Sequence, residues 1–197
     1  MRAVRLLMLS VSIIVVQRYE KRSNMTANSE KSRKFAIRNT INVMLNPVNM
    51  KRILFVCHGN ICRSPMAEFV MKDLVSKAGR EADFYIESAA TSTEEIGNEV
   101  YPPARRKLAE HDISCKGKTA RQMTRSDYLR FDLIIGMDAW NIRNINRICG
   151  GDPEGKIRML MDYTSRPGDV ADPWYTGDFE ATWRDVLEGC QGLLADV

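Results

Sequence analysis

Residues 52–68 read RILFVCHGNICRSPMAE, and the rest of the chain is organised around this stretch. The apolar run from Ile53 to Val56 is typical of a buried strand. Residues 57–63 contain glycine and asparagine and indicate a short loop. A helix is then expected from Ser64-Pro65, because serine caps helices and proline fits the first helical turn. Apolar residues at helical spacing continue this helix as far as Gly79.

A strand, a tight loop and a helix start in this order predict an anion site. Successive backbone N–H groups and the positive end of a helix favour a tetrahedral dianion. The same field favours the thiolate form of Cys57 at the start of the loop. Arg63 ends the loop with a planar guanidinium that can hold two phosphate oxygens. Gly59 is expected to supply backbone conformations denied to other residues, and Asn60 to tolerate the left-handed region. The pattern C-x5-R therefore predicts covalent phosphoryl transfer.

Simpler interpretations of the same residues have to be weighed. C-x5-R occurs by chance, and a cysteine at the end of a buried strand is often only a packing residue. The Gly-Asn within the loop and the Arg-Ser-Pro after it favour the functional interpretation. A Walker-type loop is excluded, because G-x-x-x-x-G-K-[ST] does not occur in residues 52–68. A zinc site is disfavoured because Cys57, Cys62 and His58 lack a matching C-x-x-C pair, so we expect neither a metal nor a cofactor.

The residues VCHGNICRSP at 56–65 resemble the signature of the low-molecular-weight protein tyrosine phosphatases. That group also includes thioredoxin-coupled arsenate reductases with the same fold. Three further stretches agree with the resemblance, ESAATS at 87–92, TARQ at 119–122 and DPW at 172–174. The likeness covers residues 50–197. It implies an α/β fold, a three-layer sandwich with a four-stranded parallel sheet and helices on both faces.

Strand and helix patterns alternate beyond residue 50, which independently favours a parallel sheet covered on both faces. Further strands are expected at 84–88, 131–136 and 157–160, and a short one near Ile113. Further helices are expected from Pro102 or Pro103 to Ala109, from the capping residue Asp138 to Gly150, and over 179–194. Ligands bind outside the carboxyl ends of such strands, so Cys57, Ser88 and a long loop at 172–175 should meet at one edge.

The chemistry and the resemblance together suggest a role for each residue of the site. Cys57 would be the nucleophile, Arg63 the phosphate clamp and Asp172 the general acid and base. The phosphate-binding loop would consist of His58, Gly59, Asn60, Ile61, Cys62 and Ser64. Ser64 would donate a hydrogen bond to the Cys57 sulfur. The resemblance implies that Asn60 and Ser88 lock the loop shape, and that Cys62 can form a reversible disulfide with Cys57.

The sequence departs from the family at two positions. Glu94 stands in the region where many members place an aromatic wall of the substrate slot. We therefore expect Trp174 or Tyr175 to hold the ring of a phosphotyrosine. Lys118 stands where the family often has histidine, which questions the supporting hydrogen-bond network. The resemblance implies a phosphotyrosine protein as substrate, and phosphoarginine remains an alternative.

Residues 1–49 differ in charge from the rest of the chain. They hold nine Lys or Arg and two acidic residues, a net of +7, so residues 50–197 carry −3 of the whole-chain +4. Nucleic-acid binding by the domain is therefore not expected. The apolar run from Leu6 to Val16 resembles a signal-peptide core, but it is too short to span a bilayer and no small-residue cleavage site follows. We interpret 1–49 as a dispensable extension or a mis-assigned start before Met50, with export or membrane association left open.

Five cysteines, an odd number, fit a reducing cytoplasm better than a disulfide scaffold. We expect a cytoplasmic monomer. Two other functions remain open. An arsenate reductase would need two further cysteines close together, whereas Cys115 and Cys149 are far apart in sequence. A protein that binds phosphoresidues without turnover is disfavoured, because a nucleophile, a phosphate clamp and an acid are all present.

Overall fold

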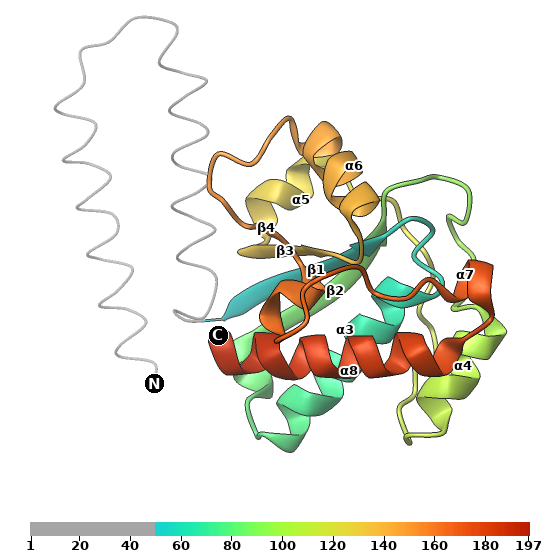
Figure 1. Cartoon of the computed structure of the whole chain (residues 1–197). Coiled ribbons are helices and arrows are strands. Elements are labelled where there is room, and N and C mark those ends of the chain that lie inside the picture. Colours follow the sequence, from blue (N-terminus) through green and yellow to red (C-terminus); the bar gives the residue numbers. More distant parts are fainter. Residues whose placement is uncertain (1–49) are drawn as a thin grey trace, which may run out of the picture. The chain divides into compact units, whose positions relative to one another are not determined.

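The computed structural model describes residues 50–197 (Figure 1). The expectations for residues 1–49 lie outside this part of the chain. Among residues 50–197, none of the helices is long and apolar enough to cross a membrane.

Four parallel strands form one sheet in the order β2-β1-β3-β4. Their bounds are Lys51–Cys57 for β1, Phe84–Ala90 for β2, Leu133–Gly136 for β3 and Ile157–Met159 for β4. β1 lies between β2 and β3, and its end residues Val56 and Cys57 pair with Gly136 and Ala90. The four-stranded parallel sheet expected from the sequence is confirmed.

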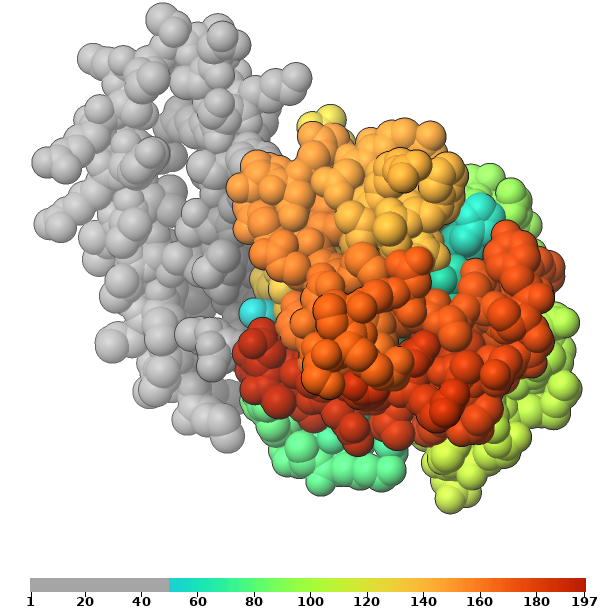
Figure 2. Space-filling model, viewed as in Figure 1, coloured from blue at the N-terminus to red at the C-terminus, as the bar shows by residue number. Residues whose placement is uncertain are grey.

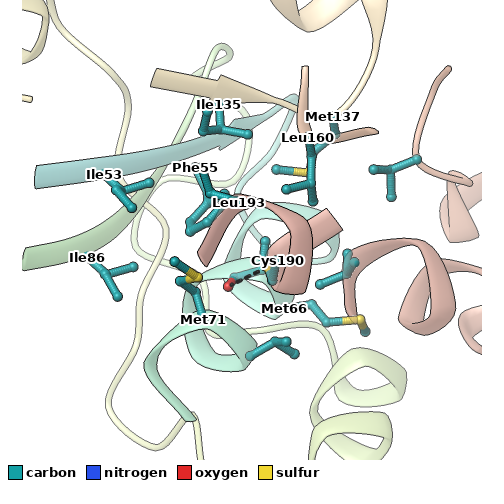
Figure 3. Close-up of a cluster of buried hydrophobic side chains, with 14 of the residues drawn as sticks. Ile53, Phe55, Met66, Met71, Ile86, Ile135, Met137, Leu160, Cys190 and Leu193 are labelled. Carbon is teal, nitrogen blue, oxygen red and sulfur yellow. Dashed lines mark hydrogen bonds between the residues drawn. The ribbon is translucent and has the colours of Figure 1, made fainter. Parts of the chain in front are cut away.

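Helices cover both faces of the sheet. Alternate residues of β1 point to opposite faces, so they belong to two different cores. Ile53 and Phe55 belong to a core formed with α3 (Arg63–Lys77), α4 (Pro102–Ala109) and α8 (Phe179–Asp196). Figure 3 shows part of this core, including Met66, Met71 and Leu193. Leu54 and Val56 belong to a second core formed with α5 (Arg125–Arg130) and α6 (Ala139–Cys149). The three-layer arrangement is visible in Figure 1.

Short helices complete the described part of the chain. They are the 3-10 turns η1 (Glu81–Asp83) and η2 (Leu160–Tyr163), and the one-turn helix α7 (Pro173–Thr176). Neither α7 nor α5 was predicted from the sequence, although α5 carries a capping box between Thr124 and Asp127. The strand expected near Ile113 is wrong. Ile113 is buried in a loop, where its N–H donates to Leu108.

The start of α3 also differs from the expectation. The helix begins at Arg63, and its N-cap position is Cys62, which makes no side-chain cap. Ser64 is therefore not the cap, and its hydroxyl is used elsewhere. The carboxyl ends of β1, β2 and β3 lie at one edge of the sheet, where loops from distant parts of the sequence meet. This edge holds the predicted site.

Candidate active site

The sulfur of Cys57 lies at the end of β1, inside a ring of hydrogen-bond donors. Its side chain is 3% exposed. The Ser64 hydroxyl lies 3.0 Å from Sγ, and the backbone N–H of Asn60 donates to Sγ over 3.3 Å. A thiolate can accept both of these hydrogen bonds.

The loop after Cys57 turns its backbone carbonyls outward. The carbonyls of Cys57, His58 and Ile61 accept N–H groups of surrounding segments at 2.8–3.0 Å, from Thr91, Ser92 and Tyr101. A trans peptide places C=O and N–H on opposite sides of the bond, and no peptide in the described chain is cis. The N–H groups that follow these three carbonyls therefore point toward the inside of the loop. Together with the start of α3 they form a site suited to an oxyanion.

Asn60 fixes the shape of the loop. It is 1% exposed and adopts φ 58, the left-handed conformation expected for it. Its Nδ2 donates to the hydroxyls of Ser64 and Ser88 over 2.9 and 2.8 Å. Its Oδ1 accepts the backbone N–H of Arg121 over 3.2 Å. One asparagine thus ties the loop to α3, β2 and the chain near residue 121.

Gly59 does not adopt the backbone conformation expected for it. It is not among the residues with positive φ. A Cβ at Gly59 would instead lie 3.1 Å from Cγ of Glu95, closer than an ordinary contact. A larger residue here would therefore press on the Glu95 side chain, which would have to move by a few tenths of an ångström.

The ion pair between Glu68 and Lys118 supports Ser88. This ion pair was not predicted from the sequence. The Ser88 hydroxyl donates to Glu68 over 2.6 Å, and Glu68 is 4% exposed. Lys118 lies 3.1 Å from the same carboxylate and donates to the Ser88 carbonyl over 3.0 Å. Lys72 pairs with the other Glu68 oxygen at 2.5 Å. Lys118 was expected to disturb the hydrogen bonds that support the loop. It is instead part of them, through Glu68 and the Ser88 carbonyl.

The Arg63 guanidinium joins two carboxylates at the mouth of the loop. Nη2 lies 2.6 Å from Asp172 Oδ2, and Nη1 donates to Asp138 Oδ2 over 2.6 Å. Burial of Arg63 opposes its charge, but the negative charges of Cys57, Asp172 and Asp138 together raise its pKa. Asp138 was recognised in the sequence only as the cap of α6, a role it also fills by accepting the N–H of Asn141. Its position directly after β3 was the signal that could have placed it in the site.

Asp172 reaches the site from the far end of the chain. It is the N-cap of α7, where its Oδ1 accepts the N–H of Trp174 over 3.1 Å. Its other oxygen faces Arg63. Cys57, Arg63 and Asp172, which the sequence predicted to act together, therefore lie at one edge of the sheet.

Comparison with known proteins agrees with this arrangement. The model of the family described as low molecular weight phosphotyrosine protein phosphatase matches residues 52–197. The low molecular weight protein-tyrosine-phosphatase YfkJ of Bacillus subtilis is 41% identical over 150 residues, which cover 75% of this chain and 96% of that protein. The Schizosaccharomyces pombe low molecular weight phosphotyrosine protein phosphatase is 43% identical over 152 residues, 74% of this chain and 96% of that protein. The crystal structure of YfkJ superposes with a TM-score of 0.73 at 41% identity and covers 75% of this chain and 94% of that one.

The chain belongs to the low molecular weight phosphotyrosine protein phosphatase family. The family expected from the motifs is confirmed, and with it the hydrolase class and the α/β fold.

Cys62, the second thiol of the phosphatase loop, has surroundings unlike those of Cys57. It is 6% exposed and packs with Ile61 and Ala120. Burial, followed by the nearby negative charges of Cys57 and Asp172, raises the pKa of Cys62 to about 12. Cys62 is therefore a neutral thiol at ordinary pH and is unsuited to be the nucleophile.

The rim of the phosphatase site carries the departures noted in the sequence. Glu94 bonds His58 at 2.9 Å, and both side chains are exposed. Trp174 is 58% exposed, with its ring centroid 5.6 Å from that of Tyr101. Tyr175 is 85% exposed. In Figure 2 a small teal area of the loop after β1 reaches the surface between the green segment after β2 and the orange-red chain of α7.

The cysteines needed by an arsenate reductase are not brought together among the described residues. Cys115 packs in the core on the α3 and α8 face, and Cys149 in the core on the α5 and α6 face. These cores lie on opposite faces of the sheet. The geometry therefore offers no thiol relay that joins Cys115, Cys149 and Cys57.

Proposed function

We propose that this chain hydrolyses protein phosphotyrosine through a cysteinyl-phosphate intermediate. The observation that carries the proposal is the convergence of three groups at one sheet edge. They are the Cys57 sulfur with its two donors, the Arg63 guanidinium and the Asp172 carboxylate. Membership of the phosphatase family supports the same reaction.

In the first step, Arg63 and the inward N–H groups of the loop bind the phosphate oxygens. They stabilise the charge on the transferring group. The Cys57 thiolate attacks phosphorus in line, so the S–P bond forms as the bond from phosphorus to the phenolic oxygen breaks. Asp172, protonated, gives its proton to that leaving oxygen. No charged phenolate then has to be released.

In the second step, Asp172 has become a carboxylate and takes a proton from an attacking water. The water oxygen bonds to phosphorus, and the S–P electrons return to Cys57. The hydroxyl of Ser64, 3.0 Å from Sγ, donates to the departing thiolate. Inorganic phosphate leaves, and the enzyme returns to its starting state.

The Cys57→Ser variant tests the mechanism. Turnover of p-nitrophenyl phosphate should fall by about a thousandfold or more, because loss of a nucleophile removes the covalent path. Binding of inorganic phosphate, measured by titration calorimetry, should persist because Arg63 and the loop N–H groups remain. Hydrolysis by Cys57→Ser at the wild-type rate would overturn the mechanism.

Acid quenching during turnover supplies a second test of the intermediate. Mass spectrometry of the quenched enzyme should find one phosphate on the peptide that contains Cys57. A panel of phosphotyrosine, phosphoserine, phosphoarginine and arsenate then measures the reaction class. Phosphotyrosine should be turned over fastest, and preferential turnover of phosphoarginine or arsenate would contradict the proposal.

A further inference from the structure

A groove lies beside the candidate site, between α4 and α7. It encloses about 440 Å³ and is lined by Tyr101, Pro103, Arg106, Pro173, Trp174, Gly177 and Phe179. The ring centroids of Trp174 and Phe179 lie 5.6 and 6.1 Å from that of Tyr101. Figure 1 shows α7 directly beside α4. Three of the seven lining residues are thus aromatic, two are prolines, and Arg106 is a cation.

Two walls of the groove are connected to segments that carry the proposed catalytic groups. Pro173 and Trp174 directly follow Asp172 in sequence. On the other wall, the backbone N–H of Tyr101 donates to the carbonyl of Ile61 in the phosphate loop over 2.8 Å. A polypeptide with its phosphotyrosine at Cys57 can therefore bring neighbouring residues close to this groove.

The cation of the groove is available for a ligand. The neighbouring side chains on α4 are engaged: Arg105 pairs with Glu99, and Lys107 with Glu110 and Glu180. Arg106 is exposed and makes no ion pair or hydrogen bond with a side chain among residues 50–197. Asp178, at the end of the groove, uses its carboxylate to cap α8. An unpaired guanidinium beside an aromatic floor suits a carboxylate on an apolar stem.

The charges of other parts of the protein restrict which ligand the groove can bind. The rim near His58 carries Glu94 and Glu95, which disfavours an acidic side chain on that side of the site. Residues 1–49 of this chain have a net charge of +7, so charge opposes their binding next to Arg106. An acidic segment of a separate polypeptide is attracted by Arg106, and in this groove it lies away from Glu94 and Glu95.

We propose that this groove binds an acidic side chain of the substrate polypeptide, close in sequence to the phosphotyrosine, through Arg106. The inference rests on the proposed function and adds a substrate preference to it. The aromatic floor contacts the methylene carbons, and the guanidinium binds the carboxylate. An ion pair of this exposed kind changes affinity by about two- to fivefold.

The test uses phosphotyrosine peptides of one length in which a single Glu is moved along the four positions on each side. In the full-length wild-type protein, kcat/KM should be raised at the positions that reach the groove. Arg106→Gln should remove that increase, about two- to fivefold, and leave the all-neutral peptide unchanged. Arg106→Glu should lower kcat/KM for the Glu peptides further and should favour the matching Lys peptides.

Two controls separate this inference from the proposed function. Arg105→Gln removes a neighbouring cation of α4 that does not line the groove, and it should leave the peptide preference intact. Hydrolysis of p-nitrophenyl phosphate, which is too small to reach Arg106, should be equal in all variants. If the wild type hydrolyses neither this ester nor any peptide, the proposed function fails. If it hydrolyses both, and Arg106→Gln shifts every peptide equally or none, only the groove proposal fails.

Discussion

At the scale of single residues, a buried charge sets the direction of the hydrogen bonds around the Cys57 sulfur. The Glu68 carboxylate can only accept, so Ser88 must donate its proton to it. The Ser88 oxygen is then an acceptor for the amide of Asn60, which also donates to Ser64. The proton of Ser64 then has two acceptors, the Cys57 sulfur at 3.0 Å and the more distant Ala89 carbonyl at 3.4 Å, and the sulfur is the nearer of the two. The chain of bonds therefore ends in a donor aimed at the sulfur.

Lys118 should affect turnover through this series of hydrogen bonds, although it does not contact the Cys57 sulfur. In Lys118→Met the buried Glu68 loses its most enclosed cation, and the Ser88 carbonyl loses its donor. We expect kcat to fall by about tenfold and the free energy of unfolding by about 1–3 kcal/mol, the cost of leaving a buried polar group unsatisfied. Turnover of p-nitrophenyl phosphate and thermal unfolding measure the two effects.

Lys72→Met is the matched control for that change. Lys72 pairs with the same carboxylate, but its side chain is 42% exposed and does not contact Ser88. Its loss should change kcat by less than about twofold, as for other exposed ion pairs. An equal fall of kcat in Lys118→Met and Lys72→Met would show that the hydrogen bonds from Glu68 to Ser64 do not depend on Lys118 in particular.

The two thiols of the loop should react differently with iodoacetate. The pKa of Cys62 is raised to about 12, and only the thiolate is the reactive form, so Cys62 stays protonated and unreactive below that pH. Below that pH, alkylation should therefore spare Cys62, and any label within the loop should lie on Cys57. Peptide mass spectrometry locates the label, and Cys57→Ser should remain unlabelled within the loop. Labelling of Cys62 at the rate of Cys57 would contradict this prediction.

At the scale of whole elements, α8 holds the residue that precedes the proposed acid. The N–H of Ala171 donates to Asp185 over 2.9 Å, and its carbonyl accepts the hydroxyl of Thr182 over 2.9 Å. Thr182 is fully buried and Asp185 is 9% exposed. Both polar groups of Ala171 are thus bound to one helix, which leaves Asp172 little freedom to leave its place opposite Arg63.

Asp185→Ala should therefore impair protonation of the leaving group more than phosphate binding. A good leaving group such as p-nitrophenol needs little protonation, whereas phenol needs much. We expect kcat for phenyl phosphate to fall by about tenfold and kcat for p-nitrophenyl phosphate by less, as for the partial loss of a general acid. Adding Asp185→Ala to Asp172→Asn should cost little more than Asp172→Asn alone.

Glu188→Gln is the control for that experiment, because Glu188 shares Arg166 with Asp185 but does not bind Ala171. It should leave the ratio of the two substrates unchanged. An equal fall for both esters in Asp185→Ala would mean that α8 acts on stability alone and not on the position of Asp172.

The same scale explains which elements were predictable from the sequence. β1 and α8 were predictable because an apolar run and a helical stripe are local patterns. α7 was missed because a single turn has too few residues for a periodicity. The strand near Ile113 was wrong because the buried side chain fills the core from a loop, and burial alone does not distinguish the two.

At the scale of the whole molecule, the contiguous stretch 57–64 was predictable from its own residues, whereas the remote residues Ser88 and Asp172 were placed in the site with the help of the family motifs. The residues from Cys57 to Ser64 were found because they follow one another in the sequence, in the loop after β1 and at the start of α3. Glu68, Asp138 and Lys118 were not assigned to it, since their partners lie 20 to 75 positions away and the contacts exist only once the sheet is formed. The motifs identified the family, whereas the structure was needed to find what holds the loop.

The described domain should act without residues 1–49. The family model spans 52–197, and relatives align over 96% of their own length with only about three quarters of this chain. All strands of the sheet and all proposed catalytic groups lie within this part. We expect the fragment 50–197 to fold with a single cooperative transition and to hydrolyse p-nitrophenyl phosphate within about twofold of the full chain, as an autonomous domain does. Its net charge of −3 instead of +4 should reverse its binding to ion exchangers near neutral pH. A fragment that is unfolded or inactive would show that residues 1–49 contribute to the domain, and the interpretation of them as a dispensable extension would be wrong.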